Sequence, residues 1–220
     1  MLGLLGLDPA ILITYIIVLL TAFSVHEFAH AWTANYFGDD TPRSYGRLTL
    51  NPMAHLDLMG SLMLILAGFG WAKPVPVNLY ALRRRSSSAP MWVAAAGPFS
   101  NFLMAVLAAI PFQLGLASLA EIGHASFLPI LPNLSLFLFS FISINLGLMV
   151  FNLIPLFPLD GEKIADYLFP PSWARALESI RPYGPMILIL LLVVTNLVGF
   201  NLIGGVTGPL TLFLTQPILG

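Results

Sequence analysis

The chain has 220 residues, of which 58% are hydrophobic and only 9% are charged, and its formal net charge is −1. Soluble domains carry roughly 25% charged residues, so this composition excludes an ordinary soluble protein and predicts an all-α polytopic membrane protein. The small net charge argues against a nucleic-acid partner. The absence of cysteine excludes disulfides and thiolate metal sites.

The first apolar stretch covers residues 9–37 and contains the sequence FSVHEFAHAW at 23–32. As a helix it would be ~43 Å long, which is enough to cross ~30 Å of hydrocarbon. Its only side chains that could carry charge near neutral pH are His26, Glu27 and His30. Such groups are costly inside a membrane helix and are usually functional. The alternative is that they are buried polar residues that tie helices together.

The stretch at 58–72 is too short for a crossing helix. It has about 15 residues where about 20 are needed, and Gly60, Gly68 and Gly70 interrupt it. Two interpretations stay open: a re-entrant loop or hairpin around 56–78, which enters and leaves the membrane on one side, or a short helix buried in the bundle.

Residues 86–120 and 125–159 contain no acidic or basic side chain, and each can hold a crossing helix. The apolar stretch 182–220 is either one long helix or a hairpin. Together these stretches predict a bundle of about 4–6 transmembrane helices.

The basic residues predict the orientation of the chain. All nine Lys and Arg residues lie between the first and second predicted spans or after the third, whereas the connection at 121–124 has none. Basic loops stay on the cytoplasmic side of a membrane. The N-terminus and the 121–124 connection are therefore expected outside.

The sequence HEFAH at 26–30 has the spacing of a metal site. His26 and His30 are four residues apart, so their imidazoles lie on one face of a helix and can share a metal ion. Glu27 lies beside that face and can reach a water molecule on the metal. A catalytic zinc usually has three protein ligands and one open position, so one ligand is still missing.

Two sources of the third ligand compete, Asp160 and the pair His55/Asp57. Asp160 is favoured because it follows the third apolar run at the depth where His26 and His30 are expected. Pro155 and Pro158 should break the helix just before it. The alternative is that Asp160 is simply a turn residue after the helix.

These motifs, in this order on apolar helices, resemble the site-2 protease family of intramembrane zinc metalloproteases. The resemblance rests on HEFAH and on NLIPLFPLDG at 152–161, and it extends through NPMAHLDLMG at 51–60, GWAKPVPVN at 70–78 and AAAGPFSN at 94–101. It covers roughly residues 20–165. The layout is similar to the compact prokaryotic type, which has no PDZ or CBS domains.

The resemblance implies which metal and which residues form the metal centre. One zinc ion per chain would be held by His26, His30 and Asp160, and Glu27 would activate the zinc-bound water. The chain would then be a zinc-dependent intramembrane endopeptidase that cleaves peptide bonds within or near transmembrane helices. Its partners would be a transmembrane protein substrate and the lipid bilayer.

The resemblance also implies roles around the metal. Asn152 would bind the substrate strand or the developing oxyanion, and Asn101 would line the same cavity. His55 is expected to be structural or to support a ligand from behind. The segment 56–78 would form the membrane-embedded hairpin or loop near the substrate. The family often has a second glycine and an arginine after the aspartate, whereas Glu162 and Lys163 follow Gly161 here.

We expect a single integral membrane domain over 1–220, with a catalytic core at about 9–165 and the apolar C-terminal stretch at 182–220. The expected location is a prokaryotic cell membrane, with several crossings and an active site near the cytoplasmic face. The sequence does not predict an oligomeric state or a substrate.

Two other functions compete with proteolysis. A metal-ion or proton transporter would also place His, Glu and Asp inside membrane helices, although transport does not require Glu27 next to His26. An inactive member of the family could act as a membrane scaffold, although the complete motif argues against that.

Overall fold

The computed structural model describes residues 7–67, 70–122, 131–198 and 202–216, and these form helices with one isolated β-bridge. Three helices are long and apolar enough to cross a membrane: α1 (Pro9–Tyr36), α5 (Ala89–Gln113) and α6 (Leu134–Asn152). They match the three predicted spans and confirm an all-α polytopic membrane protein. The connection around His124 lies outside the described residues.

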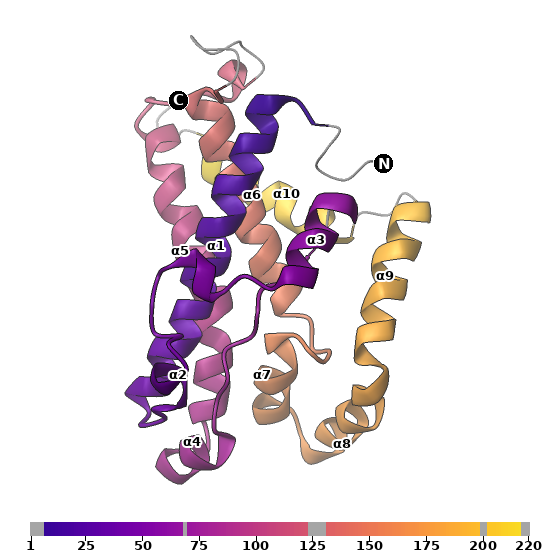
Figure 1. The fold of residues 1–220 in the computed structure, drawn as a ribbon. Coiled ribbons are helices and arrows are strands. Elements are labelled where there is room, and N and C mark those ends of the chain that lie inside the picture. Colours follow the sequence, from indigo (N-terminus) through magenta and orange to yellow (C-terminus); the bar gives the residue numbers. More distant parts are fainter. Residues whose placement is uncertain (1–6, 68–69, 123–130, 199–201, 217–220) are drawn as a thin grey trace.

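Shorter elements join and flank these three helices (Figure 1). They are α2 (Thr41–Ser44), η2 (Pro52–Ala54), α3 (Leu58–Ala67), α4 (Leu79–Arg85), η3 (Leu119–Glu121), α7 (Asp160–Leu168), α8 (Pro171–Ile180), η4 (Arg181–Tyr183), α9 (Gly184–Val198) and α10 (Leu202–Thr215). The C-terminal stretch is thus two helices of 15 and 14 residues.

Helices α1, α5 and α6 form the central bundle, in which α5 packs against both α1 and α6. The contact faces of α1 and α5 are rich in small buried residues, such as Ala22 and Ala31 on α1 and Ala94 and Gly97 on α5. Small residues let membrane helices approach closely, and close packing drives association where the surrounding lipid is equally apolar. The backbones of α1 and α5 therefore approach closely beside the HEFAH motif.

The segment containing α3 leaves the bundle and returns to where it started. Leu56 and Ala72 pair in an antiparallel bridge, and the Lys73 N–H donates to the His55 carbonyl at 2.8 Å. A side chain at Gly60 would collide with the Trp71 backbone, so glycine lets the outgoing helix pack on the segment that returns. This segment, residues 71–78, has no regular secondary structure beyond the one bridge and is called the returning strand below. This course agrees with the re-entrant interpretation, and α3 is a ten-residue helix within it.

The break after α6 places Asp160. The helix ends at Asn152, and residues 153–159 are irregular and contain a cis Phe157–Pro158 peptide bond. The next helix, α7, begins at Asp160. A side chain at Gly161 would collide with the carbonyl groups of Leu153 and Ile154. Glycine therefore lets α7 start directly against the end of α6 (Figure 1).

Candidate metal centre

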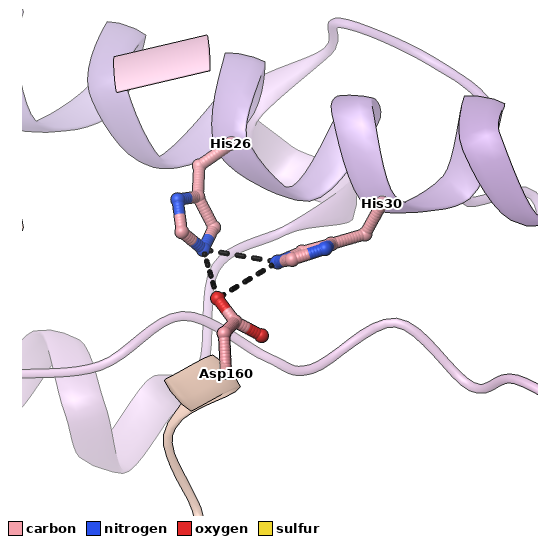
Figure 2. A group of neighbouring side chains, drawn as sticks. All are labelled: His26, His30 and Asp160. Atoms are coloured by element: carbon pink, nitrogen blue, oxygen red, sulfur yellow. Dashed lines mark hydrogen bonds and ion pairs between the residues drawn. The ribbon is translucent and has the colours of Figure 1, made fainter. Parts of the chain in front are cut away.

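Three side-chain atoms, two from α1 and one from the start of α7, converge in a buried site (Figure 2). The Nε2 atoms of His26 and His30 are 3.0 Å apart. Each lies 3.2 Å from Oδ2 of Asp160. The three side chains are 7%, 10% and 14% exposed, in that order. The structure thus brings Asp160, rather than His55 or Asp57, to the two histidines.

The tautomer of His30 follows from its other ring nitrogen. Nδ1 lies 2.7 Å from the Val93 carbonyl, which can only accept a hydrogen bond. Nδ1 must therefore carry a proton, and Nε2 of a neutral imidazole then presents a lone pair. That lone pair faces Asp160.

A chain of amides reaches His26 from α6. Asn145 Nδ2 donates to the Phe141 carbonyl at 2.8 Å, so Asn145 Oδ1 accepts from Asn101 Nδ2 at 2.9 Å. Asn101 Oδ1 is then left for His26 Nδ1, which lies 2.6 Å away. Because Oδ1 is an acceptor, His26 Nδ1 carries the proton and Nε2 presents a lone pair.

Two lone pairs and a carboxylate oxygen thus face one another, which is the donor set of a metal ion. Asp160 Oδ2 is buried and accepts no hydrogen bond from the described residues. In a tetrahedral site with ligands 2.0–2.1 Å from zinc, ligand atoms are separated by about 3.3 Å. The observed separations of 3.0–3.2 Å are close to that value. These residues therefore fit a zinc ion.

The charge on Asp160 suits the same role. Burial raises the pKa of this carboxyl, but His30 and His26, where they carry a second proton in place of a metal, outweigh that effect and hold the pKa below its usual range. The group is therefore ionised near neutral pH, and a metal ligand must be deprotonated.

Gly97 on α5 makes room for the two imidazoles. A Cβ atom at this position would collide with the rings of both His26 and His30. The close approach of α5 to α1 therefore depends on the absence of a side chain here. The backbone of α5 at Gly97 therefore lies directly against both imidazole rings.

The metal-binding atoms face a cavity of about 290 Å³. Glu27 lines this cavity together with His26, His30 and Asp160. Its side chain is outside the group of three converging atoms. Glu27 Oε2 accepts a hydrogen bond from the Val75 N–H at 3.2 Å, which ties the returning strand after α3 to the cavity wall.

The asparagines expected near the substrate occupy different positions. Asn152 lines the cavity. One N–H of its amide donates to the Leu148 carbonyl at 3.0 Å, which leaves the second N–H free of that bond. Asn101 is fully buried and is not among the described residues that line the cavity. Its amide contacts His26 and Asn145 instead.

His55 lies apart from the three metal-binding atoms and holds the returning strand. It is 1% exposed, and its Nε2 lies 2.7 Å from the Thr49 carbonyl. Its Nδ1 lies 3.5 Å from the guanidinium of Arg47, which also donates to the Lys73 carbonyl. The pair Arg47 and His55 thus anchors the strand at its start.

Sequence reasoning missed three residues that shape this site: Asn145, Gly97 and Asp39. Asp39 accepts from the Asn78 N–H at 2.6 Å and anchors the far end of the strand. Asn145 could have been noticed as a polar side chain in an uncharged membrane span. Gly97 lies in the AAAGPFSN stretch that supports the resemblance, but its contact with the two histidines depends on how two helices meet.

Comparison with known proteins gives several relatives. "Putative zinc metalloprotease YwhC" of Bacillus subtilis is 40% identical over 186 residues, which is 84% of this chain and 83% of that protein. "Putative zinc metalloprotease Rip2" of Mycolicibacterium smegmatis is 31% identical over 79% of this chain and 64% of its own length. Rip2 of Mycobacterium tuberculosis is 28% identical over 82% of this chain and 67% of its own length.

No family model matches the chain, and no solved structure gives a significant match. The similarity to YwhC nevertheless extends over most of both proteins. The chain therefore belongs to the zinc metalloprotease family of YwhC and Rip2, which is of the site-2 protease type.

Proposed function

We propose that this chain is an intramembrane zinc endopeptidase that hydrolyses peptide bonds within or near the transmembrane helices of membrane-protein substrates. The observation that carries the proposal is the convergence of His26 Nε2, His30 Nε2 and Asp160 Oδ2 beside Glu27 in one cavity. That cavity lies among helices long enough to cross a membrane. Family membership supports the metallopeptidase chemistry.

His26, His30 and Asp160 would hold one zinc ion per chain. When bound, zinc lowers the pKa of a water molecule to about 7 and so supplies a nucleophile at neutral pH. Asn101 keeps His26 in the required tautomer through the bond to Nδ1. We therefore assign Asn101 an orienting role, and not the contact with substrate that its motif implies.

Glu27 is the proposed general base. Its carboxylate lines the cavity without belonging to the metal-binding atoms. It would accept a proton at Oε from the attacking water and pass a proton to the leaving amine. The second amide N–H of Asn152 is a candidate to stabilise the oxyanion, because such a bond is strong in a site of low dielectric.

The strand at 73–78 is the proposed partner of an unwound substrate. Its prolines, Pro74 and Pro76, lack an N–H, and three of its other N–H groups are already bonded within the chain, those of Lys73, Val75 and Asn78. The Val77 N–H has no hydrogen-bond partner among the described residues, and Val77 lines the cavity. Pairing would therefore use the Val77 N–H and the carbonyl groups of the strand.

The site is proposed to lie near the cytoplasmic face of a cell membrane. Arg43, Arg83 and Lys163 lie on α2, α4 and α7. Of these helices, α2 follows the His30 end of α1, and α7 carries Asp160 at its start. Basic segments remain on the cytoplasmic side, so the N-terminus of α1 would lie outside.

Cleavage by the purified zinc-loaded chain in detergent tests this proposal. The probe is a tagged protein with one Leu/Val-rich span of about 20 residues and an Asn-Gly pair near its cytoplasmic end. We expect cleavage to be lost with a zinc chelator and restored with zinc. Asp160→Asn should lose both zinc and cleavage, whereas Asp166→Asn on the exposed side of α7 should lose neither. Metal or proton flux in liposomes without any cleavage would favour a transporter.

A further inference from the structure

A second hollow in the fold is an apolar groove between α1 and the part of the chain that includes α3. The lining residues of this part lie between Leu56 and Ala72, and it is called the α3 segment below. Its volume is about 350 Å³. From α1 it is lined by Leu12, Ile16, Leu20 and Phe23, and from the other side by residues that include Leu64. Among its described lining residues, Ser61 supplies the one hydroxyl group.

The groove adjoins the cavity that contains the metal-binding atoms. Phe23, Trp71 and Ala72 line both hollows. Phe23 comes from α1, whereas Trp71 and Ala72 come from the strand that returns after α3. These three side chains form the boundary between an apolar compartment and the cavity that contains Glu27.

One face of α1 lines both the groove and the cavity. Ile16, Leu20 and Phe23 lie in the groove, and His26 and His30 continue the same three- to four-residue spacing into the cavity. Residues at this spacing lie on one side of a helix. A segment lying along this face would contact the groove first and would reach the metal centre about 15 Å further on, counted from Ile16 to His26.

We propose that this groove, which we call the α1–α3 groove, docks the uncut apolar part of a substrate's transmembrane segment. The proposal rests on the proteolytic function proposed above. The docked part would stay helical beside α1, and the chain beyond Phe23 would unwind into the cavity. The scissile bond would then lie about ten residues from the docked end.

The lining favours a polypeptide helix over a lipid chain as the occupant. In a bilayer an apolar groove gains nothing from the hydrophobic effect, because lipid tails are equally apolar. Helices associate there through close packing at small residues and through side-chain hydrogen bonds. Ser61 and Ala72 are small, and the Ser61 hydroxyl can bond a substrate group that a lipid tail lacks. Because Phe23, Trp71 and Ala72 line both hollows, a substrate helix docked in the groove would also lie next to the metal cavity.

Filling the groove tests the proposal with two probes. One is the membrane-spanning test protein described above, and the other is a short soluble quenched-fluorescent peptide that contains only the residues around its cleaved bond. Ser61→Trp should lower kcat/KM for the membrane-spanning probe by about tenfold and leave the peptide nearly unchanged. Leu107→Trp is the matched control, because Leu107 is 63% exposed on α5 and lines neither hollow.

Equal cleavage of the membrane-spanning probe by Ser61→Trp and the unmodified chain would overturn the proposal and leave the groove to lipid. If the unmodified chain cleaves neither probe, the proteolytic function itself fails, and the groove proposal fails with it. Zinc content and melting temperature of each variant identify any loss of folding.

Cross-linking gives a second measurement that does not depend on cleavage or on a bulky substitution. The chain has no cysteine, so Ser61→Cys, which is nearly isosteric, introduces a single thiol. In a Glu27→Gln background, it should cross-link to a cysteine placed in the span of the probe about ten residues from the Asn-Gly pair. Leu107→Cys should not. Equal cross-linking at both positions, or none at Ser61→Cys, would contradict docking in the groove.

Discussion

Asn145 on α6 holds Asn101 on α5 through a 2.9 Å hydrogen bond, and both side chains are fully buried. Asn101 in turn accepts from the Nδ1–H of His26 on α1 at 2.6 Å. The three central helices are thus joined by one polar chain that ends at a metal-binding atom. This chain fixes which nitrogen of His26 faces Asp160.

Removal of this polar chain should weaken zinc binding. Groups that orient a metal-bound histidine contribute about 10- to 100-fold to metal affinity, so Asn101→Leu should lower zinc affinity by about that factor. Asn145→Leu should have a smaller effect in the same direction, because it acts through Asn101. Competition with a chromophoric chelator measures both. Unchanged affinity in Asn101→Leu would show that His26 is held by other contacts.

Gly97→Ala should damage the metal centre although it adds only one methyl group. The new Cβ would collide with the rings of His26 and His30, so α5 must move away from α1 or the rings must turn. We expect lower zinc occupancy and lower activity. The control is Gly147→Ala on α6, where nothing lies within 4 Å of the added atom.

Alanine favours a helix over glycine by about 1 kcal/mol, so Gly147→Ala should keep its zinc and its stability. Metal analysis and thermal unfolding of the two variants measure the difference. Full zinc occupancy in Gly97→Ala would contradict the close packing of α5 on the histidines.

Asp39→Ala should impair cleavage without removing zinc. Asp39 accepts from the Asn78 N–H at 2.6 Å and from the Thr41 N–H at 3.0 Å, and so anchors the end of the strand at 73–78. Hydrogen bonds to charged groups contribute about 1.5–3 kcal/mol, so we expect activity to fall by about tenfold or more. Asp40→Ala, at the exposed neighbouring position, should behave like the unmodified chain. Normal cleavage by Asp39→Ala would remove the need for an anchored strand.

His55→Ala should separate a structural role from metal binding. The ring fills a buried position and bonds the Thr49 carbonyl at 2.7 Å. Its loss should lower the melting temperature by about 5 °C or more while zinc stays at one ion per chain. Thermal unfolding measures the change in melting temperature, and metal analysis of the folded variant measures its zinc content. Loss of zinc from a variant that remains folded would make His55 part of the metal site.

The sequence predicted the long helices well, because an uncharged apolar run of membrane length is rare outside a membrane-spanning helix. It also predicted that His26, His30 and Asp160 lie at one depth. Histidines four residues apart share a helix face, and the prolines before Asp160 end α6. The position of α3 stayed open between two interpretations, because a ten-residue apolar segment fits both. The bridge between Leu56 and Ala72 favours the returning course.

Contacts between segments that lie far apart in the chain could not be predicted from the sequence. Asn101 was expected at the cavity, but helix packing turns its amide toward His26 and Asn145. The bond from the Val75 N–H to Glu27 joins residues 48 positions apart. The groove along α1 exists only because the α3 segment folds back beside it. Such features depend on how helices meet, and residue types alone do not record that.

The central claim is that Glu27 acts on a water molecule at a zinc site that it does not help to build. The most direct measurement compares zinc content and cleavage of the membrane-spanning probe for Glu27→Gln and the unmodified chain. Glu178→Gln on α8 is the control, because Glu178 is not among the residues that line the cavity. We predict that Glu27→Gln keeps one zinc ion per chain and loses cleavage by about 100-fold or more. Cleavage by Glu27→Gln at the rate of the unmodified chain would contradict this account.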